Sequence, residues 1–219
     1  MPFDAVFLSA VTAELRQSLT GGRIDKVQMP GRDLVVLQFH GPGGSGRLLL
    51  SASPNAPRVH LTQAAMENPA QPPMFCMLLR KHLSGGRIAE LTQPPMERLV
   101  DLTLDCTDEM GEPARKHLIL ELMGRSANLI LVDGQGRIID CLRRVDFEMS
   151  EKRQVLPGLF YQLPPRPEKE NPQTESEEAI DEALVHFEGR KRFDKWLLDR
   201  YGGQDVILSA DPELDRWRA

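Results

Sequence analysis

Residues 15–24 read LRQSLTGGRI, and residues 79–88, which begin 64 positions later, read LRKHLSGGRI. In each copy an apolar and basic run, typical of the last turns of a helix, meets Gly-Gly and continues as Arg-Ile. Glycine adopts the left-handed backbone that ends helices, and isoleucine favours strands. The phrase therefore predicts a helix, a turn and a strand, made twice. We interpret this repetition as chiefly architectural.

Periodicity extends the pattern on both sides of the two phrases. Residues 4–19 have helical spacing, with apolar residues at Val6, Phe7, Ala10, Val11 and Leu15. A second helix is expected over MFCMLLRKHL, after Pro72-Pro73, because the first helical turn tolerates proline. Short runs between Gly, Pro and Asn predict strands at 23–29, 33–40, 47–53, 57–63, 87–93, 97–106, 116–123, 128–133 and 137–147. The expected fold is α+β, internally repeated, with two small antiparallel sheets and a packed helix on each.

The second part of the chain changes in composition. After the strand-like LFYQL at 159–163, the stretch PPRPEKENPQTESE is rich in proline and charge. Such a segment buries too little apolar surface to fold alone, so we expect a linker or mobile loop over 165–177. It separates a first domain, 1–164, from a helical region, 178–219, that is interrupted at Gly202-Gly203.

Composition restricts the functional classes. The 219 residues carry a net charge of −5, which argues against a surface that coats nucleic acid everywhere but allows a local basic patch. No apolar run reaches the length of a membrane span, and MPFDAVFLSAV lacks the basic start of a secretory signal. Cys76, Cys106 and Cys141 are odd in number and widely spaced, so we expect packed, reduced thiols and a cytoplasmic location.

The sequence lacks the common motifs for catalysis and metal binding. The histidines and cysteines have no metal-ligand spacing, and no G-x-S-x-G is present. The stretch GPGGSG at 41–46 lacks the Lys-Ser/Thr of a phosphate-binding loop and is better explained as a hairpin connection. We therefore expect no catalytic residue, metal or cofactor, and a protein that is not an enzyme.

Two places combine an acid with an arginine. Glu97-Arg98 follows Pro94-Pro95 before a strand, and Glu121 and Arg125 flank a glycine at the end of another. Arginine reads or stacks on bases, and a carboxylate accepts hydrogen bonds from base amino groups. A structural ion pair is the alternative at each place. Basic clusters, which can equally be solvated faces or helix ends, occur at 80–82, 115–117, 143–144 and 190–192.

Three stretches resemble the N-terminal region of the NFACT family: FDAVFLSAVTAEL, PPMFCMLLRKHLSGGRI and ELMGRSANLILVDGQGRIIDCLRRV. Its bacterial members are RqcH, also called fibronectin-binding protein A-like. The resemblance implies an NFACT-N domain over 1–164, similar to the N-terminal domain of MutM-type DNA glycosylases. The start of a helix-hairpin-helix domain would follow over 178–219.

The resemblance also implies a function in ribosome-associated quality control. Family members bind the large ribosomal subunit that holds an obstructed nascent-chain tRNA, and recruit alanyl-tRNA for template-free alanine tailing. The chain would then bind tRNA and rRNA without catalysis of its own. In much of the family the acid of the first acid–Arg pair is Asp, so Glu97 is a departure. Positions implied to bind tRNA are Asp4, Glu97, Arg98, Glu121, Leu122, Met123 and Arg125.

Two alternatives follow from the same resemblance. Met1-Pro2 suggests a DNA glycosylase/lyase, because a terminal proline amine suits Schiff-base attack, but Phe3 stands where glycosylases have Glu. The older family name suggests an adhesin that binds fibronectin.

Overall fold

The computed structural model describes residues 4–165, 175–185, 196 and 200. The chain divides into one unit of Ala5–Pro164 and another of Met1–Asp4 with Pro165–Ala219. In the latter, α3 spans Glu177–Val185, and the hydroxyl of Ser176 accepts a hydrogen bond from Ala179 N at 3.2 Å. Most of the expected linker, the Gly202-Gly203 break, the 190–192 cluster and Pro2 lie outside the described residues.

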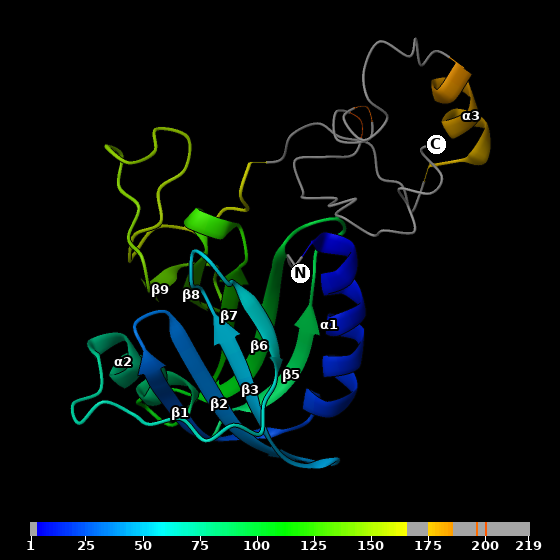
Figure 1. Ribbon diagram of the computed structural model, residues 1–219. Coiled ribbons are helices and arrows are strands. Elements are labelled where there is room, and N and C mark those ends of the chain that lie inside the picture. Colours follow the sequence, from blue (N-terminus) through cyan, green and yellow to red (C-terminus); the bar gives the residue numbers. More distant parts are fainter. Residues whose placement is uncertain (1–3, 166–174, 186–195, 197–199, 201–219) are drawn as a thin grey trace. The chain divides into compact units, whose positions relative to one another are not determined.

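The larger unit contains two α-helices, one short 3-10 helix and nine strands (Figure 1). The strands form one antiparallel sheet in the order β4-β3-β2-β1-β5-β6-β7-β8-β9. Within this unit the two expected helices and nine expected strands occur, although the strand expected over 137–147 ends at Cys141 and LFYQL contributes only the isolated bridge between Arg137 and Phe160. The elements are α1 Ala5–Leu19, β1 Arg23–Gly31, β2 Leu34–Gly41, β3 Gly44–Ser51, β4 Arg58–Leu61, α2 Met74–Leu83, β5 Arg87–Thr92, β6 Leu99–Thr107, β7 Pro113–Glu121, η1 Gly124–Ser126, β8 Asn128–Asp133 and β9 Ile138–Cys141.

The two copies of the repeated phrase pair with each other where β1 meets β5. Gly21 N donates to Ile88 O and Gly85 N donates to Ile24 O, both at 2.8 Å. The same exchange recurs between Ile24 N and Gly86 O at 2.8 Å, and between Ile88 N and Gly22 O at 2.7 Å. The expectation of two separate sheets was therefore wrong, since these reciprocal bonds join both halves into one sheet. The expected likeness to MutM-type glycosylases stays a prediction.

The turn glycines behave as the sequence predicts. Gly21 and Gly85 have φ of 81° and 80°, in the left-handed region that favours glycine. GPGGSG forms the β2–β3 hairpin connection, where Gly41 pairs with Gly44. The short connection thus has an architectural role, as expected.

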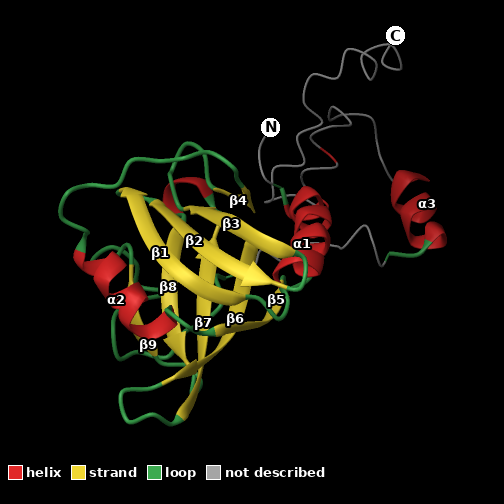
Figure 2. Ribbon diagram, turned by 90° about the horizontal axis from the view of Figure 1, so that it is seen from below, coloured by secondary structure: helices red, strands yellow, loops and turns green. Residues whose placement is uncertain are grey.

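Each helix is tied to the strand of the other copy. Arg16 of α1 donates from Nε to Leu91 O of β5 at 3.0 Å, and Arg80 of α2 donates from Nε to Val27 O of β1 at 2.9 Å. Residues 16 and 80 are equivalent in the repeat, as are 27 and 91. Figure 2 shows α1 and α2 at opposite sides of the sheet. The repeat predicted that each helix lies on its own sheet, whereas each helix contacts the first strand of the other half as well as strands of its own half.

The face that α1 buries differs from the expected one. Its buried residues are Ala5, Leu8, Thr12, Leu15 and Leu19, a stripe with steps of three and four that continues to the end of the helix. Val6 and Phe7, which the periodicity placed on the apolar face, are 46% and 42% exposed. Local periodicity allowed both faces, and the packing against the sheet selected the longer stripe.

The strands β6 to β9 are covered on both faces. Leu102, Leu104 and Leu118 are almost completely buried on one face. On the other, a cluster forms from Leu99, Ile119, Ile130, Val132, Ile138, Cys141 and Val155. Cys76, Cys106 and Cys141 are free and buried, as the spacing predicted. In the part of the chain that the structure describes, no helix is long and apolar enough to cross a membrane.

Candidate functional site

Two loops carry most of the predicted site residues, and they lie side by side. Residues 93–98 connect β5 to β6, and residues 122–127 connect β7 to β8. The adjoining strand ends are paired, with Leu99 opposite Glu121. Beyond that pair, Leu122 N donates to Arg98 O at 2.7 Å. We call 93–98 and 122–127 the paired loops; the fold brings Glu97-Arg98 next to the stretch that contains Arg125.

The first of the paired loops has a defined backbone. Gln93 Nε2 donates to Glu97 O at 2.8 Å and to Ala5 O, at the start of α1, at 2.9 Å. Met96 has φ of 57°, a left-handed conformation that costs a non-glycine residue about 1–3 kcal/mol. Glu97 is only 6% exposed. This strained turn therefore fixes the positions of Glu97 and Arg98.

Asp4, another of the predicted site residues, directly precedes α1 in the chain. It belongs to the smaller unit, whereas both of the paired loops belong to the larger one. The site described in the following paragraphs is therefore made of residues from the larger unit alone.

Glu121 is bound inside the protein. Its carboxylate accepts hydrogen bonds from Arg153 Nη1 at 3.2 Å, from Arg153 Nη2, and from the Tyr161 hydroxyl at 2.9 Å. The Arg153 guanidinium also lies over the Tyr161 ring, 5.3 Å from its centroid. Burial, and then the Glu121 charge, raise the pKa of Tyr161, so the phenol stays protonated and donates. The structural ion pair weighed for Glu121 exists, but with Arg153 rather than Arg125.

The remaining predicted residues of the second loop differ in exposure. Leu122 is fully buried, Met123 is half-buried, and Arg125 is exposed on the short 3-10 turn Gly124–Ser126. Ala127 N closes that turn by donating to Gly124 O at 3.0 Å. Leu122 thus belongs to the core, and Arg125 is the side chain that this loop presents to solvent.

Arg143, which the sequence suggested only as part of a basic cluster, connects the second loop to the first half of the sheet. Its Nη2 lies 2.7 Å from Asp33 Oδ1 in the β1–β2 turn, and its Nη1 donates to Ala52 O at 2.8 Å and to Ala127 O. Asn128 fixes the backbone of Arg143 by donating to its carbonyl at 2.7 Å and accepting from its N–H at 2.9 Å. No local motif predicted this clamp.

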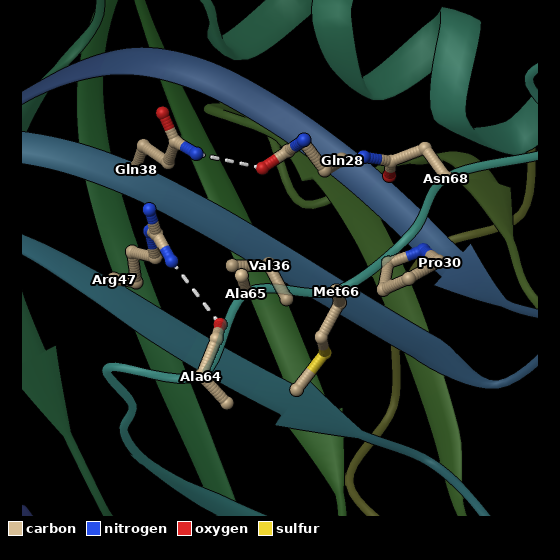
Figure 3. A pocket seen from close by; sticks show the side chains of 9 residues that line it. All are labelled: Gln28, Pro30, Val36, Gln38, Arg47, Ala64, Ala65, Met66 and Asn68. Carbon is tan, nitrogen blue, oxygen red and sulfur yellow. Dashed lines mark hydrogen bonds between the residues drawn. The ribbon is translucent and has the colours of Figure 1, made fainter.

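A separate polar hollow of about 100 Å³ lies over β1, β2 and β3 (Figure 3). Gln38 Nε2 donates to Gln28 Oε1 at 2.7 Å, and Arg47 Nη1 donates to Ala64 O at 3.1 Å. Arg47 thereby holds the extended segment that borders the hollow. None of the predicted site residues lines it.

One further polar cluster, on β6 and β7, does not have catalytic geometry. His117 Nδ1 lies 2.9 Å from Asp101 Oδ2 and 3.3 Å from Thr103 Oγ1. A nucleophile relay needs both ring nitrogens, whereas here one nitrogen faces both partners. Burial raises the pKa of Asp101, and His117 opposes that shift. Among the described residues no group of three or more His, Cys, Asp or Glu could hold a metal ion.

The fold is that of a known class of proteins. Residues 4–210 match the family described as NFACT N-terminal and middle domains, and the chain belongs to that family. It is 41% identical over 212 residues to the Rqc2 homolog RqcH of Bacillus subtilis, a match that covers 96% of this chain and 37% of that protein. It is 33% identical over 141 residues to the human ribosome quality control complex subunit NEMF, covering 64% of this chain and 12% of NEMF.

Solved structures of related proteins have the same fold. The N-terminal domain of fibronectin-binding protein PavA from Streptococcus pneumoniae superposes with a TM-score of 0.83 at 38% identity, covering 91% of this chain and 74% of that one. The fibrinogen-binding protein from Staphylococcus aureus gives 0.79 at 32% identity, covering 92% and 70%. The chain spans little more than a third of the bacterial curated relatives that it matches.

Proposed function

We propose that this chain is the N-terminal part of a cytoplasmic ribosome quality control factor that binds tRNA through the paired loops. The whole protein would bind the obstructed large ribosomal subunit and recruit alanyl-tRNA for template-free alanine tailing. The relatives named for ribosome quality control support the process. The observation that carries the site is the contact between the two loops, where Leu122 N bonds to Arg98 O.

The geometry suggests different roles for the predicted residues. Arg98 is half-buried on the fixed first loop, and Arg125 is exposed on the second; guanidinium groups on rigid loops suit unpaired bases and phosphates. Glu121 and Leu122 are positioning residues in this proposal, because the first is held by Arg153 and the second is core. Peptide-bond formation would belong to the ribosome, so the protein itself would bind rather than catalyse.

The test is a titration of the full-length protein with alanine tRNA and with a second tRNA. Glu97→Ala/Arg98→Ala should abolish the preference for alanine tRNA, while Glu97→Asp, the residue common in the family, should keep it. A matched control is Asp105→Ala/Arg115→Ala. It removes an exposed acid–Arg pair bonded at 3.0 Å, which lies toward the opposite end of the β6–β7 pairing from the paired loops. Equal affinity of the unmodified protein for all RNA would refute the proposal.

A second candidate function is binding of a fibronectin-type ligand, which the names of the solved relatives favour. Surface plasmon resonance with immobilised fibronectin, together with labelling of intact cells, tests it. Absence of both binding and surface labelling would exclude this function.

A further inference from the structure

Two ion pairs neutralise the acids next to the paired loops. The Asp33 carboxylate is paired with Arg143, and the Glu121 carboxylate with Arg153. Each pair has no net charge, so neither acid offsets a neighbouring cation. Arg32 precedes Asp33 in the β1–β2 turn, and Arg125 lies on the second loop. Arg32 and Arg125 therefore lie beside acids that are already paired with other arginines, although the chain as a whole is acidic.

Arg32 and Arg125 share two properties. Both side chains are exposed. Neither makes a hydrogen bond or an ion pair with any residue that the structure describes. Exposed arginines without an internal partner keep all five donors for an external anion, and the planar guanidinium matches the two oxygens of a phosphate.

The clamp formed by Arg143 brings their backbones together. One guanidinium contacts both Asp33, the neighbour of Arg32, and Ala127, two residues after Arg125. Its third contact, to Ala52 O at 2.8 Å, fixes its orientation. The β1–β2 turn, which belongs to the first half of the repeat, thus flanks the second of the paired loops.

We propose that Arg32 is a phosphate contact for RNA bound at the paired loops, acting together with Arg125. This proposal rests on the proposed tRNA binding and extends that surface onto the first half of the sheet. The two arginines contact the sugar-phosphate backbone and position the RNA, while Arg98 on the first of the paired loops distinguishes bases. Affinity should then depend on Arg32 equally for every tRNA.

The experiment measures tRNA affinity of the full-length protein over a series of salt concentrations. The slope of log K against log salt is negative, and each lost phosphate contact reduces its magnitude by about 0.7 to 0.9. Arg32→Ala should therefore reduce the magnitude by the amount for one contact. Arg32→Ala/Arg125→Ala should reduce it by the amount for two contacts, with the preference among tRNAs unchanged. Arg32→Gln, which keeps more of the side chain's bulk, should match Arg32→Ala.

The control variant is Lys81→Ala/Arg115→Ala, which removes two exposed cations paired with Glu109 and Asp105. It changes the net charge as much as the double variant but should leave the slope unaltered. An unchanged slope in Arg32→Ala, or an equal decrease in the control, would overturn this inference alone. A full-length protein that binds no tRNA would instead overturn the proposed function.

Discussion

Replacing Arg153 by alanine should destabilise the larger unit strongly, because it leaves the Glu121 carboxylate buried without its cation. The Glu121 side chain is 2% exposed and that of Arg153 is 13% exposed, so solvent screens the pair little. Removing one partner of a buried pair costs about 3–5 kcal/mol. The loss is a large share of the roughly 5–15 kcal/mol that stabilises a typical domain.

Urea unfolding followed by circular dichroism measures this loss. With a slope of about 2.5 kcal/mol per molar urea, the midpoint should fall by roughly 1–2 M. Tyr161→Phe removes one hydrogen bond to a charged group, so its cost should be smaller, about 1.5–3 kcal/mol.

The double variant Glu121→Gln/Arg153→Ala separates the charge from the packing. Because it removes the buried charge, it should recover part of the stability lost in Arg153→Ala. A loss of stability below about 1 kcal/mol in Arg153→Ala would refute the buried ion pair. So would a double variant that is less stable than Arg153→Ala, because removing the Glu121 charge would then have recovered nothing.

Three further predictions concern the β1–β5 junction, the Arg143 clamp and the buried thiols. Gly86→Ala should cost about 1–3 kcal/mol in urea unfolding, because its Cβ would lie 2.7 Å from Cys106 Sγ, whereas Gly43→Ala, with nothing within 4 Å, should be almost neutral. Arg143→Ala should cost about 3 kcal/mol through its lost bonds to Asp33 and two carbonyls; a change within about 0.5 kcal/mol would contradict the clamp. Burial raises the pKa of Cys106 and of Cys141 to about 11 from 9.0. The unfolded chain therefore releases these protons first as pH rises, so stability should fall between about pH 9 and 11, and neither thiol should react with a disulfide reagent at about pH 8 before urea unfolds the protein.

The helices and strands could be predicted from the sequence because their signals are local. Gly-Gly after a helical run, or alternating residues before Asn128, act within a few positions. The partners of β1 could not be predicted, since the exchange between Gly21 and Ile88 joins residues 67 positions apart. The buried face of α1 was also ambiguous, because two apolar stripes satisfy the same period.

The sequence placed the Glu97-Arg98 and Glu121–Arg125 stretches at strand ends, and the structure shows that these strand ends are neighbours. The sequence did not show which partners the side chains have. The residues that donate hydrogen bonds to Glu121 are Arg153 and Tyr161, and they come from a later segment without regular periodicity. A carboxylate in a sequence does not show whether its acceptors face solvent or an internal guanidinium, and only the tertiary fold decides this.

The contact of each helix with the other half has a consequence for how the molecule could be divided. Each helix covers the first strand of the other half as well as strands of its own, so a half alone would lack the helix that packs on its first strand. A cut in the extended segment between β4 and α2 would yield two fragments that need each other to fold. Because both carry the same Gly-Gly-Arg-Ile phrase, either fragment could also pair with a second copy of itself through the same four backbone bonds. The four backbone bonds between β1 and β5 are thus the contact on which either arrangement would depend.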